Sequence, residues 1–133
     1  MNHTTLVTRD IAAPRATALL AEVLALGVLL EAAFAGGFIG GHHMWLSWHQ
    51  NLGDVLLVLP LASVAIGIGA RRRRREAASS LTTRIALLFF AIVAVAAGHE
   101  GGAMLAIHIP AAVVMVGIIV RQVTMCRDTR ATT

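Results

Sequence analysis

Four long apolar runs constrain the fold of this chain more than any other feature of its sequence. Each run contains at most two acidic or basic side chains. A helix of about 20 apolar residues crosses the roughly 30 Å hydrocarbon core of a bilayer, so each run is long enough to span one. The sequence therefore predicts transmembrane helices at about residues 16–39, 48–70, 81–98 and 104–123.

The composition supports a membrane protein. Hydrophobic residues make up 57% and charged residues only 14% of the 133 residues, whereas about a quarter of the residues are charged in soluble domains. We therefore expect an all-α fold, an integral membrane up-down four-helix bundle. Its transmembrane domain would cover residues 14–123, with polar, unstructured cytoplasmic tails at residues 1–13 and 124–133.

The arginines lie on one side of the predicted bundle. They cluster before the first span, between the second and third spans, and after the fourth, whereas the loops around residues 40–47 and 99–103 contain none. Short loops rich in arginine stay in the cytoplasm. This rule places both termini inside, and both histidine-bearing loops outside, the bacterial cytoplasmic (inner) membrane. The five arginines at residues 71–75 are interpreted as a topology determinant that contacts membrane lipid, not as a nucleic-acid-binding patch.

Three residues inside the spans break the apolar pattern. Pro60 lies mid-span and is expected to kink the second helix. Arg84 is expected to extend its long side chain to the lipid interface. Glu31 lies about two-thirds of the way along the first span, where a carboxyl group is costly in lipid, so its side chain should face the bundle interior. There it would belong to a functional site or act as a neutral hydrogen bonder between helices.

The two halves of the chain follow the same plan, as two pseudo-repeated helical hairpins. In each half a span ends in small residues, a histidine follows a glycine in the loop, a methionine comes next, and another histidine lies one turn into the following span. The second histidines of the two halves are His49 and His108. Because spans two and four of an up-down bundle run parallel on one diagonal, these two side chains should face each other at the same depth.

Small residues accompany both of these histidines. Gly53 lies one turn after His49, and Ala112 lies one turn after His108, so each pair shares a helix face. Two facing imidazoles with little bulk beside them suit a flat macrocycle, and we expect them to hold the iron of one haem b near the outer face. Gly53, Ala112 and Glu31 are the further cofactor-binding residues in this interpretation. With both axial positions filled by protein, the haem would transfer electrons, with a quinol or a redox protein as partner.

Three short motifs carry a resemblance to known proteins. They are Glu31-x-x-Phe34-x-Gly36, His49-x-x-x-Gly53 and Leu105-x-x-His108-x-x-x-Ala112. Over roughly residues 20–120 the chain resembles a family of small bacterial four-span membrane proteins of unknown function, which usually have glutamine where this chain has Glu31. It is also similar to four-helix membrane b-type cytochromes, in which histidines of different helices hold haem. Those proteins often carry two haems, whereas the arginine-rich half of this chain has no second histidine pair, so the resemblance implies at most one.

Other functions remain open at this point. The arginine-free side could bind copper or another metal, because imidazole and thioether groups are copper ligands. The candidate ligands are His42, His43, His99, Met44 and Met104, together with His49 and His108. The chain could instead be a non-catalytic accessory subunit, and a homodimer is open in each case. A proton-coupled transporter would need dimerisation, because four spans alone seldom form an alternating-access pathway. We expect an electron carrier or binding protein in preference to a stand-alone enzyme.

Overall fold

The computed structural model describes the backbone of residues 4–73 and 78–131 and the side chains of residues 16–73 and 80–125. Every regular element in these ranges is a helix, so the predicted all-α fold is confirmed. The elements are α1 (Thr4–Ile39), α2 (Met44–Leu56), α3 (Val58–Arg72), α4 (Ala78–Glu100), a short 3₁₀ turn η1 (Gly102–Met104) and α5 (Leu105–Ala131). His3, Arg74 and Arg75 lie outside the described residues.

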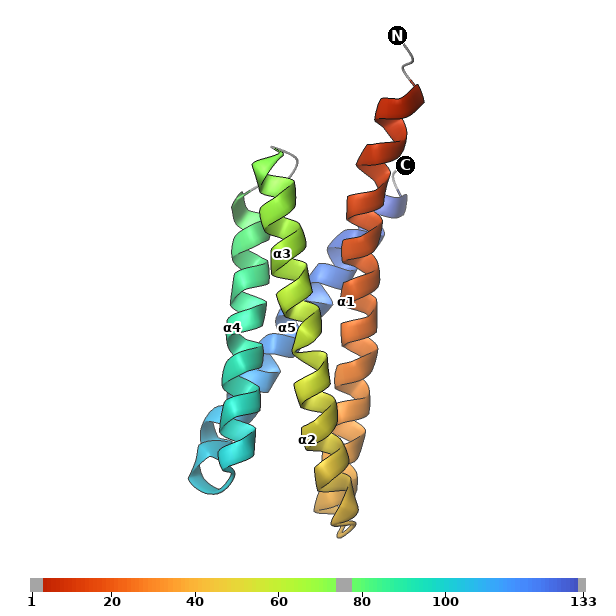
Figure 1. Cartoon of the computed structure of the whole chain (residues 1–133). Helices are drawn as coiled ribbons and strands as arrows, with labels where there is room; N and C mark the ends of the chain where they lie inside the picture. The colour runs from red at the N-terminus through yellow and green to blue at the C-terminus, as the bar shows by residue number, and fades with distance from the viewer. Residues whose placement is uncertain (1–3, 74–77, 132–133) are drawn as a thin grey trace.

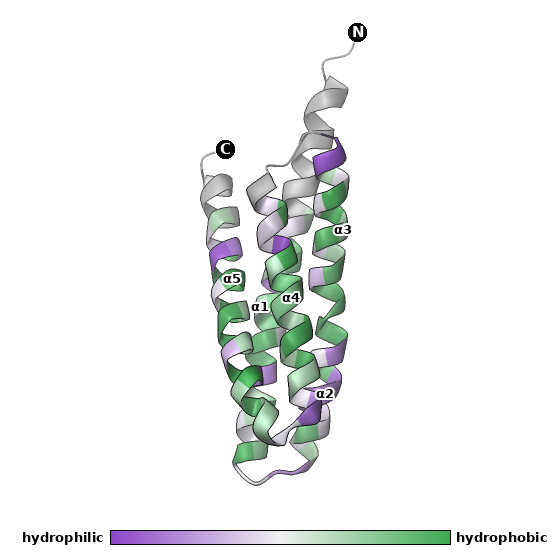
Figure 2. Ribbon diagram, turned by 90° about the vertical axis from the view of Figure 1, so that its left-hand side faces the viewer, coloured by the Kyte–Doolittle hydropathy of each residue, from purple (hydrophilic) through white to green (hydrophobic). Residues whose placement is uncertain are grey.

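Four helical segments are long and apolar enough to cross a membrane, in agreement with the four apolar runs. They are Ala16–Ile39, Met44–Arg72, Ser80–Glu100 and Gly102–Met125. The bodies of the helices are mostly hydrophobic, and hydrophilic residues lie mainly towards the two ends (Figure 2). Many large apolar side chains on these helices are exposed, among them Leu26, Leu29 and Val113. The fold thus fits a multi-pass membrane protein.

The helices pack so that the pair α2 and α3 lies diagonally opposite α5. Both α1 and α4 pack against α2, α3 and α5. Within the described ranges, neither α1 with α4 nor α5 with α2 or α3 forms such close backbone packing. The α1–α2 turn lies at the same end of the molecule as the connection from α4 to α5 (Figure 1). We call this the histidine end, because His42, His43 and His99 lie there, and we call the opposite end, where α3 closes with Arg71 and Arg72, the arginine end.

The second span is divided in its middle into α2 and α3, near Pro60, where a kink is predicted. Helix α2 ends at Leu56 and α3 begins at Val58, with Leu57 between them. Proline has no backbone N–H, so Pro60 cannot donate a hydrogen bond to the carbonyl of Leu56, four residues earlier. The proline ring is itself fully buried. The interruption therefore lies one turn before the proline, where the helical hydrogen-bond ladder loses a donor.

Helices α1 and α5 extend beyond the apolar runs, which differs from the unstructured tails that we expected. Helix α1 begins at Thr4 and contains Pro14 well inside it. Helix α5 continues to Ala131. Starting a helix is costly, but extending one adds a hydrogen bond with each residue. Neither tail contains a glycine within its helical part, so the helices formed by the apolar runs continue into the polar segments.

Arg84 points into the bundle, and the prediction that it reaches the lipid interface is wrong. The residue is only 6% exposed. One guanidinium nitrogen, Nη1, donates to Ser63 Oγ at 2.7 Å and to the Ser63 carbonyl at 3.2 Å, and Nη2 donates to Thr17 Oγ1 at 3.2 Å. A buried guanidinium needs such acceptors in place of water. Arg84 therefore joins α4 to α1 and α3.

Gly67 makes room for this arginine, and we expect it to tolerate no side chain. A Cβ added there would lie 2.8 Å from Arg84 Cδ and 3.1 Å from Leu81 Cδ1, whereas a Cβ at Gly69 of the same helix would meet nothing within 4 Å. Overpacking costs about 1–3 kcal/mol, while alanine otherwise favours a helix over glycine by about 1 kcal/mol. Thermal unfolding in detergent should show a lower midpoint for Gly67→Ala and an unchanged or higher midpoint for Gly69→Ala. Equal midpoints would contradict the buried position of Arg84.

Candidate cofactor site between His49 and His108

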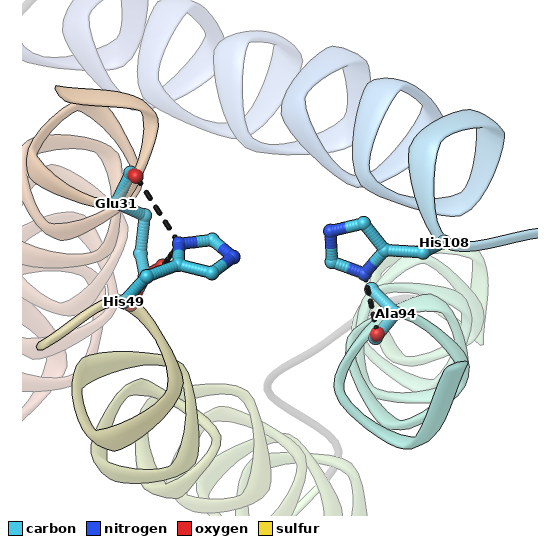
Figure 3. Close-up of polar contacts among 4 residues, drawn as sticks. All are labelled: Glu31, His49, Ala94 and His108. Carbon is cyan, nitrogen blue, oxygen red and sulfur yellow. Dashed lines mark hydrogen bonds and ion pairs between the residues drawn. The ribbon is translucent and has the colours of Figure 1, made fainter. Parts of the chain in front are cut away.

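The structure brings together the two histidines that the repeat singled out. His49 comes from α2 and His108 from α5, the diagonal pair of helices. Their ring centroids lie 6.0 Å apart and the ring planes are nearly perpendicular, at 83°. The Nε2 atom of each ring points towards the other ring across the interior (Figure 3). Two ring nitrogens from opposite walls are thus presented to one small volume.

The other nitrogen of each ring is held by a backbone carbonyl of a neighbouring helix. His49 Nδ1 lies 3.2 Å from the carbonyl oxygen of Glu31 on α1, and His108 Nδ1 lies 2.7 Å from that of Ala94 on α4. An Nδ1–H that donates to these carbonyls leaves the Nε2 lone pair of both rings free for a ligand bond. The backbone therefore fixes the tautomer and orientation that a metal-binding imidazole requires. The role of Ala94 was not predictable from the sequence, because any residue type can supply a main-chain acceptor.

Glu31 lies beside His49, in the bundle interior as expected. Its side chain is 12% exposed, and its Oε2 forms an ion pair or hydrogen bond with His49 Nδ1 (Figure 3). The second carboxyl oxygen, Oε1, is fully buried and has no hydrogen-bond partner in the described part of the chain. The pair joins α1 to α2 and adds a carboxylate contact to one of the two imidazoles.

The glycine that gives His108 its room is Gly98 of α4, which we did not predict as a site residue. A Cβ added at Gly98 would lie 2.9 Å from His108 Nδ1 and 3.1 Å from its Cε1. A Cβ at Gly53 would meet Glu31 Oε1 at 3.6 Å and Val95 Cγ2 at 4.0 Å. Gly53 therefore faces the Glu31 carboxyl group, not the His49 ring. The sequence feature that could have identified Gly98 as a site residue is its position at the end of the third predicted span, directly before a histidine.

A cavity of about 550 Å³ extends from the two histidines between α1, α2, α4 and α5. Ala112 and Gly53 line it, and most of the wall consists of aliphatic side chains. Its polar wall residues are Glu31, His49, Gln50, His99 and His108. Cofactor pockets typically measure about 300–1,000 Å³ and combine an apolar wall with a few polar groups. The size and lining of this cavity match that description.

His42 and His43 contact aromatic rings in the α1–α2 turn. The His42 ring stacks on Trp45 with centroids 5.8 Å apart, and the His43 ring lies 6.2 Å from that of Phe38. Both histidines are exposed. Each one packs against its own hairpin, so their contacts explain their positions without a metal.

The remaining residues of the metal alternative are exposed or paired separately. His99 Nε2 contacts Asp54 Oδ1 at 2.9 Å, an exposed pair between α4 and α2. Met44 is 65% and Met104 39% exposed. Among residues 16–73 and 80–125 the side chains contain no group of three or more His, Cys, Asp or Glu that could hold a metal ion. The structure thus joins His49 to His108, and His99 lines the same cavity, but the described side chains form no group of three that could hold a metal ion.

Comparisons of the chain with protein families, with curated protein sequences and with solved structures gave no match.

Proposed function

We propose that this chain is an integral membrane b-type haem protein that holds one haem b between His49 and His108 and transfers electrons. The observation that carries the proposal is the pair of facing imidazoles, with centroids 6.0 Å apart and both Nε2 atoms directed into the space between them (Figure 3). Each ring is already fixed at Nδ1 by a carbonyl. Gly98 leaves His108 the room to take this position.

The separation of the rings suits two axial ligands of one iron. Metal–imidazole bonds measure about 2 Å, so two collinear bonds place the ligand nitrogens about 4 Å apart. With one ring radius added on each side, the ring centroids stand roughly 6 Å apart. The angle between the ring planes does not oppose ligation, because each ring binds through its own Nε2. The two histidines therefore need little movement to hold the iron of a haem.

The donor set favours haem over a bare metal ion. The iron of a haem has four macrocycle nitrogens, so two histidines complete its coordination. Structural zinc sites use four protein ligands and catalytic ones use three, and protein copper sites combine several imidazole or sulfur ligands. The site offers His49 and His108, and the described side chains add no third His, Cys, Asp or Glu in a metal-binding group. The apolar cavity beside the pair provides the surface that a porphyrin would cover.

The proposed haem site would lie inside a membrane-spanning bundle. The four helical segments would cross the bilayer alternately up and down, with the arginine end in the cytoplasm because arginine-rich short loops stay inside. The bundle would lie in the bacterial cytoplasmic membrane with both termini inside. His49 and His108 belong to the half nearer the histidine end, so the haem would lie near the outer face. A quinol in the membrane or a redox protein at that face would be its electron-transfer partner.

The residues of the chain have separate tasks in this function. His49 and His108 would hold the haem iron through their Nε2 atoms, and a bound haem would supply reversible one-electron transfer. The acceptors at Nδ1 would keep the two imidazoles oriented: the Ala94 carbonyl for His108, and the carbonyl and carboxyl group of Glu31 for His49. The aliphatic wall of the cavity would contact the apolar face of the macrocycle. Ligation by two protein side chains would suit electron transfer better than binding of a small substrate.

An optical spectrum of the purified chain tests the proposal. We expect protein expressed with a haem precursor and purified in detergent to show a Soret band, a narrow α-band after reduction, and about one haem per chain by the pyridine haemochrome assay. Elemental analysis for copper belongs to the same experiment. Copper without a Soret band would favour the metal-handling alternative. Absence of both haem and metal would contradict the proposal and favour an accessory subunit.

A further inference from the structure

The two candidate iron ligands differ in one respect. His108 Nδ1 contacts a neutral backbone carbonyl, that of Ala94, at 2.7 Å. His49 Nδ1 contacts the backbone carbonyl of Glu31 at 3.2 Å and also the carboxyl group of the same residue. Both imidazoles thus have a backbone carbonyl at Nδ1, but only His49 also has a carboxyl group there (Figure 3).

The carboxyl group of Glu31 is buried without full compensation by the described residues. The residue is only 9% exposed, and its Oε1 atom has no hydrogen-bond partner among them. Burying a carboxylate costs several kcal/mol unless a charge or hydrogen bonds offset it. A Cβ placed at Gly53 would lie 3.6 Å from Oε1, so this oxygen faces the Gly53 position of α2. Helix packing alone does not explain the free-energy cost of burying this carboxyl group, so we expect the group to have a specific role.

We propose that Glu31 sets the redox potential of the haem through His49, an inference that rests on the proposed function. A carboxylate that accepts the Nδ1–H of a ligating histidine makes the imidazole a stronger electron donor to its metal. Ferric iron in a dianionic porphyrin keeps a net positive charge that ferrous iron lacks, so a buried negative charge nearby stabilises the ferric state. Reduction of the iron by one electron would oxidise its partner, a quinol or a redox protein, by one electron, with a quinol also releasing a proton, and the histidine ligands of the iron would stay the same. Glu31 is a positioning residue in this process because it acts through His49.

Replacement of Glu31 by glutamine is the direct test. Glu31→Gln keeps the size of the side chain and its ability to hydrogen-bond but removes the carboxylate charge. We expect the haem spectrum to persist and the ferric-to-ferrous equilibrium to shift about tenfold towards ferrous, which is about 59 mV upwards for a one-electron couple. Spectroelectrochemical titration of the α-band measures this shift. Its readout is independent of any turnover.

Asp54→Asn provides a matched control. Asp54 lies on the same helix as His49, but its side chain is 51% exposed and contacts His99 at the histidine end. The substitution removes the same charge from a site where water and salt screen it. We expect the midpoint potential of Asp54→Asn to stay close to that of the wild type. A shift equal to that of Glu31→Gln would overturn the inference, since it would show a general effect of net charge.

A second variant at the same position keeps the inference testable if Glu31→Gln accumulates poorly. Glu31→Asp retains the charge but shortens the side chain by one methylene, so the contact with His49 Nδ1 weakens. We expect an upward shift of the potential smaller than that of Glu31→Gln. An unchanged potential in either haem-loaded variant would overturn the inference, and so would loss of haem from both, because Glu31 would then be a structural residue. The proposed function fails separately, by absence of haem from the wild-type chain.

Discussion

Replacing His108 with alanine is expected to abolish the spectrum of a six-coordinate haem. The variant removes one of the two rings that face each other at 6.0 Å, and the described side chains of the site contain no third histidine in a metal-binding group. His49→Ala should have the same effect, since either loss leaves the iron with one protein ligand. We expect the haem content to fall at least tenfold or the remaining haem to lose its narrow reduced α-band. The measurement is the reduced-minus-oxidised spectrum of purified protein, normalised to chain concentration.

Two controls separate loss of a ligand from loss of the fold. His43→Ala removes an exposed histidine that packs against Phe38 at the end of the bundle, and its spectrum should match that of the wild type. Free imidazole added to His108→Ala should restore the narrow α-band, because the missing side chain leaves room for a molecule of that shape. If His108→Ala kept a six-coordinate spectrum without added imidazole, the assignment of His108 would be wrong.

Gly98→Ala is the second change with a large expected effect, although it adds a single methyl group. The new Cβ would lie 2.9 Å from His108 Nδ1, closer than side-chain carbons approach such an atom, so the imidazole must move. The movement would break the 2.7 Å hydrogen bond to the Ala94 carbonyl and turn Nε2 away from His49. We expect at least a tenfold loss of haem affinity, the scale of effects seen when the groups that orient metal ligands are changed. Haem titration of the apoprotein, followed at the Soret band, measures the affinity.

Gly53→Ala is the matched comparison for this prediction. The substitution is identical and also lies in a helix that lines the cavity, but the nearest atom to the new Cβ would be Glu31 Oε1 at 3.6 Å, an ordinary contact distance. Haem affinity should therefore change little in Gly53→Ala. Stability should hold or rise, because alanine favours a helix over glycine by about 1 kcal/mol. Equal losses in both variants would show that the cavity, and not the position of His108, limits haem binding.

Much of the fold was predictable because it follows from local sequence. Apolar run length specifies the four helical segments, since a bilayer fixes the number of residues needed to cross it. Pro60 specified the interruption of the second span, because the missing N–H acts on the residue one turn earlier. The extent of the helices was less predictable. Apolar runs end where the hydrocarbon would end, but a helix ends only where its backbone hydrogen bonds stop, so α1 and α5 continue into polar residues.

The meeting of His49 and His108 was also predictable, because the two half-chains repeat the same order of residues and their helices share one diagonal of the bundle. The contacts behind the rings were not. Whether Arg84 extends to lipid or turns inward to Ser63 depends on the space left by Gly67, a residue 17 positions away. In the same way, the importance of Gly98 depends on which helix packs beside His108.

The sequence by itself determined that this protein is a set of four long apolar helices with two histidines placed at corresponding points, because helix formation and span length depend on neighbouring residues. Only the tertiary structure decided which backbone carbonyl holds each ring, that Glu31 lies against His49, and that Gly98 and not Gly53 clears the space for an imidazole. These contacts join different helices, and their distances depend on how the helices pack. Helix packing sums many weak contacts along the whole length of the bundle, and no short sequence pattern records that sum.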